Sequence, residues 1–307
     1  MRPSALFPAL CAIVAVVLGF LCIFAGHKKD FMEDYHILTL NTSRIGQNIL
    51  SESSSSSSSS SGLLGLIQNA TSSIASDITD ELNDAVNSVA ESIAEDIGLS
   101  DFYSAHLMDY CWGDYTPQPV ANATVSSSQI HKNVSACSNA TAMFHFDPTA
   151  VLEKSLNESG LGITLDDLNW PDDIQQGLDA LRIAYKAMFV LYCIAVGASF
   201  LVLVGSLVGV FLASGRLSAF FNVMLAILAF LAFGIASAIA TAIAVKGADV
   251  INQYGNDIGI EAHRGGKFMA ISWAATGVLF LAILAWCVEC CIGRRHSKRA
   301  RTFAEKP

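Results

Sequence analysis

The chain has 307 residues, of which 52% are hydrophobic and only 15% are charged, and its mean hydropathy is +0.47. This composition excludes an ordinary soluble domain and indicates a membrane protein. The net charge of −9 is unevenly distributed: residues 27–186 hold 22 acidic and 7 basic side chains, whereas residues 293–307 hold 6 basic and 1 acidic. The acidic segment disfavours anionic partners, so no nucleic acid is expected to bind.

Four long apolar runs contain no Asp, Glu, Lys, Arg or His, and a membrane-spanning helix needs about 20 such residues. The runs are Ala5–Ala25, Ala187–Ala213, Leu217–Val245 and Phe268–Val288. We therefore predict an all-α membrane protein built as a bundle of four transmembrane helices. Residues 26–186 form a large first loop, and residues 246–267 form a second loop on the same side.

The first run has a second interpretation as a cleaved signal peptide, because Arg2 supplies a positive start and Ala25 a small residue for a cleavage site. However, Ile23 is a poor partner for such a site, and the run exceeds the usual 7–15 residues of a signal segment. We expect the run to be retained as a signal anchor, with residues 1–4 in the cytoplasm. Cleavage would leave three spans and the same outer loop.

Every N-glycosylation sequon lies in the first loop, which therefore should face outward, because glycans are added on the lumenal side. The six acceptor residues are Asn41, Asn69, Asn122, Asn133, Asn139 and Asn157. The basic cluster 294–301, within the tail 289–307, is expected in the cytoplasm. Lys28 and Lys29 oppose this orientation, but the sequons and the tail outweigh them. We predict a multi-pass protein with both termini in the cytoplasm.

Within the first loop, residues 51–61 are serine except for Glu52 and predict a flexible linker. Apolar residues then recur every three or four positions through Gly62–Gly98, which predicts an amphipathic helix. That helix either packs on its own ectodomain or offers a seam to a neighbour. A second amphipathic segment, Pro171–Lys186, is expected to extend the second transmembrane helix outward.

Cys111 and Cys137 are the two cysteines of the outer loop, and in an oxidising compartment they are expected to pair. The short runs Asp109–Trp112 and Met143–Phe146 suggest strands beside them. A small disulfide-tied β-element is therefore predicted within the loop.

Small residues recur at helix-packing spacing within two of the spans and let helices approach closely. They are Gly205 and Gly209 in the second span, and Gly234, Ala238 and Ala242 in the third. Packing within one bundle is expected, with a homo-oligomer as the alternative.

Three cysteines, Cys287, Cys290 and Cys291, lie at the inner end of the fourth span beside the basic tail. Such cysteines are candidates for S-acylation, with unmodified thiols as the alternative. The neighbouring bases should attract anionic lipid of the inner leaflet.

No catalytic motif is recognisable: the chain has no nucleophile elbow, no zinc-protease helix motif and no P-loop. His145 and Asp147 are too few to hold a metal by themselves. Surface positions are expected for the ectodomain histidines, which are His27, His36, His106, His131 and His145. We therefore predict a non-enzymatic protein with no cofactor and no metal.

The chain resembles the fungal Sur/PalI membrane proteins, which are claudin-like four-span proteins of eisosomes at the cell cortex. The resemblance rests on an ordered series of motifs: Tyr110-Cys111-Trp112-Gly113, Cys137, Phe144-His145-Phe146-Asp147-Pro148, Trp170-Pro171, Ala187-Met188-Phe189 and Leu191-Tyr192. One departure from animal claudins is that Trp112 follows Cys111 instead of preceding it, which argues against a paracellular-barrier role.

The resemblance implies a structural organiser of plasma-membrane domains that supports cell-wall, endocytic and sphingolipid homeostasis. Its partners would be plasma-membrane lipids, sphingolipid among them, and eisosome-type scaffold proteins. One alternative is a PalI-like component of ambient-pH signalling, although such members usually carry a longer tail than residues 289–307. A second alternative is a claudin-like regulator of cation influx, against which the charge-free spans argue.

Overall fold

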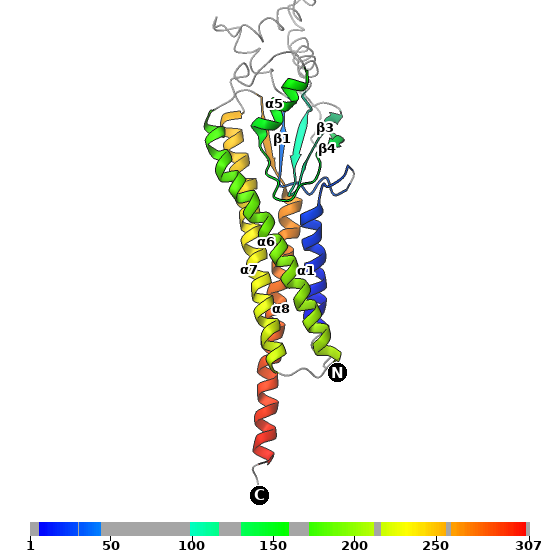
Figure 1. The fold of residues 1–307 in the computed structure, drawn as a ribbon, viewed down its shortest axis with the longest axis vertical. Coiled ribbons are helices and arrows are strands. Elements are labelled where there is room, and N and C mark those ends of the chain that lie inside the picture. The colour runs from blue at the N-terminus through cyan, green and yellow to red at the C-terminus, as the bar shows by residue number, and fades with distance from the viewer. Residues whose placement is uncertain are drawn as a thin grey trace, which may run out of the picture. The chain divides into compact units, whose positions relative to one another are not determined.

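A computed structural model describes most of the chain outside part of the first loop (Figure 1). The described residues are 6–29, 31–43, 99–116, 130–159, 172–211, 216–255 and 259–304. The predicted linker 51–61 and the amphipathic helix predicted for Gly62–Gly98 lie outside them.

The chain divides into two compact units. We call them the helix unit, made of Met1–Phe24, Lys186–Thr241 and Lys267–Pro307, and the sheet unit, made of Ala25–Tyr185 and Ala242–Gly266.

Within the described residues, four helices are long and apolar enough to cross a membrane, which confirms the predicted four-helix fold. They are α1 (Leu6–Phe24), α6 (Asp172–Phe211), α7 (Arg216–Gly255) and α8 (Gly266–Ala304). The candidate spans within the last three are Asp179–Gly209, Ser218–Gly255 and Gly266–Val288. Helix α6 begins where the second amphipathic segment was predicted, and α8 continues through much of the basic tail (Figure 1).

One buried cluster of the helix unit is built around small side chains. Ala12 of α1, Val202 of α6 and Ala226 of α7 are buried together, and Ile283 of α8 packs against them. Large apolar side chains such as Phe200 point outward. This arrangement is typical of membrane helices, because lipid solvates apolar side chains and small residues allow backbones to approach.

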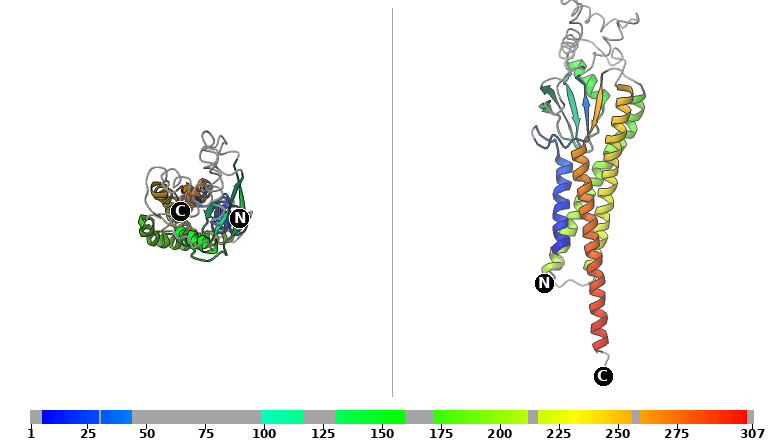
Figure 2. Two further views of the ribbon diagram at one scale, coloured as in Figure 1. Left: turned by 90° about the horizontal axis from the view of Figure 1, so that it is seen from above. Right: turned by 180° about the vertical axis from the view of Figure 1, so that it is seen from behind.

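The sheet unit contains a five-stranded antiparallel sheet in the order β4-β3-β2-β1-β5 (Figure 2). The strands are β1 (Leu38–Asn41), β2 (Phe102–Ala105), β3 (Tyr110–Thr116), β4 (His131–Cys137) and β5 (Glu261–Arg264). Strand β5 comes from the second loop and pairs with β1 of the first, for example Leu40 with Ala262. The two loops therefore build one sheet.

One predicted strand is wrong. The Met143–Phe146 segment forms a turn and irregular chain, with Met143 at a φ of 58°. Its rings Phe144 and Phe146 pack against Tyr110 with centroids 6.1 Å away in each case, so side-chain packing replaces backbone pairing.

Directly after this segment lies α5 (Pro148–Ser159), a helix that the sequence analysis did not predict. Its start follows ordinary capping rules. The Asp147 side chain accepts a hydrogen bond from the Ala150 amide at 3.1 Å, and Pro148 occupies the first helical position. Helix α5 lies across one face of the sheet (Figure 1), where Ser155 hydrogen-bonds Tyr103 of β2 at 3.0 Å.

Candidate functional site

The predicted disulfide between Cys111 and Cys137 is present and joins β3 to β4. The two cysteines face each other directly across the strand pair. Cys111 is fully buried in a cluster with Phe102, Tyr115 and Val134. The disulfide therefore ties the outer strand of the sheet to the core of the sheet unit.

The hairpin between β2 and β3 carries two buried ionisable side chains, His106 and Asp109. The His106 amide donates to the Asp109 carbonyl oxygen at 2.9 Å, which closes the turn. The β-pairing of Ala105 with Tyr110 continues directly beyond it. Both ionisable side chains have no solvent exposure.

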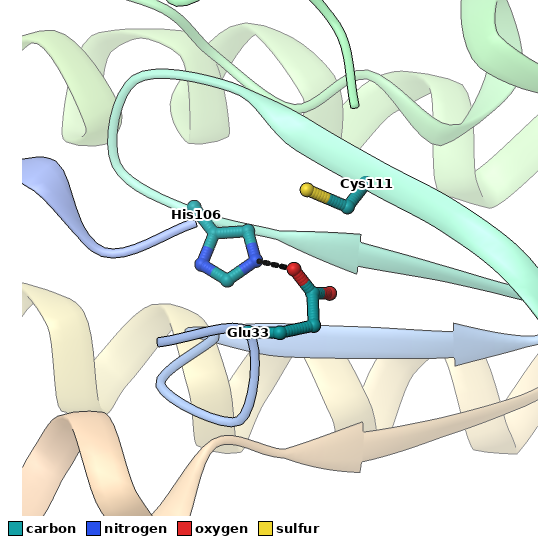
Figure 3. Close-up of side chains that lie close together, drawn as sticks. All are labelled: Glu33, His106 and Cys111. Carbon is teal, nitrogen blue, oxygen red and sulfur yellow. Dashed lines mark ion pairs between the residues drawn. The ribbon is translucent and has the colours of Figure 1, made fainter. Parts of the chain in front are cut away.

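The segment that follows α1 brings Glu33 to this hairpin. A turn in which the Tyr35 amide donates to the Met32 carbonyl oxygen at 3.0 Å shapes the segment, and the Ile37 amide bonds the Ala105 carbonyl oxygen at 2.8 Å. The Glu33 Oε2 atom then lies 3.5 Å from His106 Nε2 (Figure 3).

Cys111 completes a group of three potential ligand residues. One donor atom each from Glu33, His106 and Cys111 lies within 4.8 Å of the other two (Figure 3). Gly26 crosses directly over this group with a φ of +80°, and a Cβ at that position would overlap the His106 ring. Only glycine combines that backbone conformation with so close an approach.

Burial dominates the electrostatics of the cluster. It raises the pKa of the Asp109 carboxyl to about 6; His106 opposes this rise, and Glu33 adds to it. The neighbouring His36 has its pKa lowered to about 3 by burial, assisted by the charge of Lys132, so its ring is neutral. The His36 and His106 rings meet edge to face, with centroids 6.4 Å apart.

The described residues provide no hydrogen bond to either carboxylate oxygen of Glu33 or Asp109, nor to either ring nitrogen of His106. Among these three side chains, Glu33 and His106 contact each other through a long ion pair. Buried polar groups normally have partners, so this cluster is an exception that requires an explanation.

The expectation of surface histidines is wrong for His106, which is fully buried. The sequence did not reveal the cluster because Glu33 and His106 are 73 positions apart. The segments next to these two residues meet through the pairing of β1 with β2. The pair His145 and Asp147 does not form a site either: Asp147 caps α5, and His145 accepts a hydrogen bond from Arg182 at 3.0 Å.

The predicted glycosylation sites differ in accessibility. Asn133, Asn139 and Asn157 are exposed, whereas Asn69 and Asn122 lie outside the described residues. Asn41 is only 7% exposed, and its Oδ1 accepts hydrogen bonds from Ser43 at 3.1 Å and 2.7 Å. This burial distinguishes Asn41 from the three exposed sequons, and glycosylation of all six stays a prediction.

The residues predicted to pack helices together differ in how closely they approach a neighbouring helix. An added Cβ at Gly205 would overlap the Asn222 side chain, whereas at Gly209 it would meet no atom within 4 Å. Gly234 approaches Thr276, where an added Cβ would lie 3.7 Å from the Thr276 methyl carbon. Ala238 and Ala242 are exposed on α7, and a packing role for them stays a prediction. Because α7 is apolar on all sides, its sequence does not reveal which face is buried.

A buried hydroxyl network inside the helix unit was not predicted. Tyr192 of α6 and Ser272 of α8 hydrogen-bond at 2.6 Å, Ser272 and Ser237 of α7 at 2.5 Å, and Ser237 and Thr276 at 3.3 Å. The network joins three helices without any charge.

Of the three predicted acylation sites, Cys287 is exposed and its thiol is free. The side chains of Cys290 and Cys291 lie outside the described part of the chain, although their backbone belongs to α8. Acylation of these residues stays a prediction.

Four apolar helices and a small disulfide-tied antiparallel sheet define a claudin-like four-span membrane protein. The SUR7/PalI family profile matches residues 4–285, so the chain belongs to this family, and the suspected resemblance is confirmed. Searches of curated proteins and of solved structures gave no match.

Proposed function

We propose that the protein is a non-enzymatic structural organiser of fungal plasma-membrane domains of the eisosome type. The observation that carries this proposal is membership of the SUR7/PalI family across residues 4–285. In this role the protein supports cell-wall, endocytic and sphingolipid homeostasis. Its partners are plasma-membrane lipids and eisosome-type scaffold proteins.

The character of the helix unit supports an organiser over a cation conduit. Ion pathways usually contain ionisable side chains or carboxylate rings within the membrane. Here the four apolar runs contain none, and the buried hydroxyls of Tyr192, Ser237 and Ser272 bond one another across helices. A bundle held together in this way is suited to presenting surfaces to lipid and to neighbouring proteins.

The expected orientation also favours this function. With both termini in the cytoplasm, the acidic sheet unit faces the cell wall and the basic tail faces the inner leaflet. The tail can then hold anionic lipid or an acidic scaffold surface at about 1 kcal/mol for each base near the membrane.

A fluorescent fusion of the full chain in live fungal cells tests the proposal. Static cortical patches at the plasma membrane are expected. Deletion should disturb patch integrity, wall-stress tolerance or resistance to sphingolipid-synthesis inhibitors, while growth in acidic and alkaline medium stays equal.

A uniform membrane signal, together with a growth defect restricted to alkaline medium, would contradict the organiser. It would support the alternative of a PalI-like component of ambient-pH signalling. An unaltered patch pattern in the deletion strain would also count against the organiser, since an organiser is needed for the pattern itself.

A further inference from the structure

Two lysines at the start of the first loop differ in charge from the acidic segment that contains them. Lys28 and Lys29 lie within residues 27–186, which hold 22 acidic and 7 basic side chains. Basic residues beside a span usually stay in the cytoplasm, so this pair opposes the orientation that the sequons and the basic tail predict. A basic pair on the outer side against that preference indicates a partner there.

Backbone hydrogen bonds hold the pair within a tight loop. We call it the lysine loop and define it by Gly26, His27, Lys28, Lys29 and Phe31. The Gly26 amide donates to the Phe31 carbonyl oxygen, and the Phe31 amide donates to the Lys28 carbonyl oxygen, both at 3.0 Å. The His27 and Phe31 rings meet edge to face with centroids 5.0 Å apart. Lys28 and Lys29 are both exposed, so the loop presents two ammonium groups to its surroundings.

The lysine loop lies near the membrane surface because it follows the first span almost directly. Helix α1 ends at Phe24. Four further residues extend at most about 14 Å, which keeps Lys28 within that distance of the helix end. Phe31 in the same loop is 39% exposed. An exposed aromatic ring beside basic side chains is typical of segments that bind at the membrane interface, where the ring enters the boundary between headgroups and acyl chains.

Contacts within the described part of the chain do not account for the two lysines. None of the ion pairs between described residues includes Lys28 or Lys29. Compensation of the helix dipole of α1 is not their role either, because that effect is confined to the last turn, and the last turn of α1 contains no basic residue. The two charges are therefore available to a ligand.

The group that two adjacent ammonium groups recognise best is a phosphate, to which lysine binds as a point charge. Repulsion from the surrounding acidic segment disfavours a soluble anion. A lipid phosphate is instead held at the membrane by its acyl chains, and it interacts with the lysines within the screening length of about 8–10 Å. The position of the lysine loop thus favours a lipid headgroup over a free phosphate.

We propose that Lys28 and Lys29 bind the phosphate of an anionic lipid in the outer leaflet, with the Phe31 ring placed at the boundary between headgroups and acyl chains. The contact adds a particular lipid site to the proposed function and rests on that function for the outward orientation of the loop. It also gives the basic pair a reason to lie on the outer side.

The first test measures the reactivity of each lysine in the full chain, reconstituted into vesicles and acetylated with a membrane-impermeant reagent. Vesicles of phosphatidylcholine alone are compared with vesicles of phosphatidylcholine and phosphatidylinositol, and mass spectrometry gives the acetylation rate at each lysine. With phosphatidylinositol present, Lys28 and Lys29 should react about fivefold more slowly, the change that corresponds to about 1 kcal/mol for a base near an anionic surface. This measurement needs no variant.

Lys154 of α5 is the matched control within the same molecule, because its side chain is exposed and pairs with Glu158 at 3.8 Å. Its acetylation rate should be the same in both kinds of vesicle. Equal slowing at Lys154 would overturn the proposal, since it would indicate a general effect of the surface potential. Unchanged rates at Lys28 and Lys29 would also overturn it. So would slowing of the same size by soluble inositol phosphate in phosphatidylcholine vesicles, because the ligand would then be a free phosphate.

The second test uses the double variant Lys28→Gln/Lys29→Gln, which removes both charges at exposed positions, and Lys154→Gln as its control. Native mass spectrometry of the full chain gives the number of phosphatidylinositol molecules bound. The double variant should bind one fewer than the native chain, and Lys154→Gln should bind the native number. An unchanged number in the double variant would contradict the proposal, because the basic tail would then account for all the bound lipid.

Both tests use the purified chain and are separate from the imaging of cortical patches. Failure of the lipid contact would leave static patches as evidence for the organiser. A uniform membrane signal in cells would leave a positive vesicle result standing, so the two failures are distinguishable.

Discussion

At the scale of single residues, two glycines one helical turn apart have different surroundings. At Gly205 a Cβ would overlap the Asn222 side chain, and at Gly209 it would meet open space. Gly205→Ala should therefore lower stability by about 1–3 kcal/mol through overpacking, while Gly209→Ala should change it little. Thermal unfolding of both variants in detergent checks this. Equal midpoints for the two would show that Asn222 moves aside without cost.

Removal of the disulfide is the second residue-scale prediction. Cys111→Ser or Cys137→Ser should remove about 3.5 kcal/mol of loop-closure stabilisation for a loop of this length and cause retention in the secretory pathway. Surface labelling of intact cells measures delivery. Cys193→Ser, at an exposed free cysteine, is the control and should reach the surface normally. Normal delivery of both disulfide variants would contradict the prediction.

At the scale of elements, hydroxyl bonds hold α6, α7 and α8 together. Ser272→Ala removes the bonds to Tyr192 and Ser237. Such bonds between membrane helices contribute about 0.6 kcal/mol each, so a loss of about 1 kcal/mol is expected. Ser199→Ala is the control, because Ser199 bonds only the Ala195 carbonyl of its own helix. Unfolding measured in mixed detergents should give a lower free energy of unfolding for Ser272→Ala than for Ser199→Ala. A lower free energy of unfolding for Ser199→Ala would contradict the prediction.

A second element-scale contact attaches β5 to α7. The Asn252 side chain accepts from the Ala262 amide at 2.6 Å and donates to its carbonyl oxygen at 3.0 Å. Asn252→Ala should cost about 1–3 kcal/mol, because it leaves both backbone groups without that partner. Asp249→Ala breaks only the exposed ion pair with Arg264 and should cost no more than about 1 kcal/mol. Proteolysis of the second loop under native conditions should be faster in Asn252→Ala alone.

At the scale of the whole molecule, topology and folding together decide which sequons carry glycans. Asn133, Asn139 and Asn157 are exposed and should be occupied, whereas the buried Asn41 should be empty. Glycopeptide mass spectrometry gives the occupancy of each site. A glycan on Asn41 would show that β1 forms differently in the cell, and protease access to a carboxy-terminal tag in intact cells would overturn the orientation.

Much of the architecture could be predicted from local patterns. Charge-free runs of sufficient length indicate membrane helices because an unpaired charge is costly in hydrocarbon. Two cysteines in an oxidising compartment indicate a disulfide. The strand predicted for Met143–Phe146 was wrong because alternating aromatic residues suit both a strand and a packed irregular segment, and periodicity does not separate the two.

Local patterns in the chain were sufficient to predict the four membrane helices, the disulfide and, through the ordered motifs, the SUR7/PalI family. Which helix faces are buried became clear from the three-dimensional packing alone, because the hydrophobic pattern of a helix that is apolar on all sides does not distinguish one face from another. The three-dimensional packing also decided the cluster of Glu33, His106 and Asp109. That cluster depends on pairing β1 with β2 and β5 across long stretches of chain, and no local pattern records such pairing.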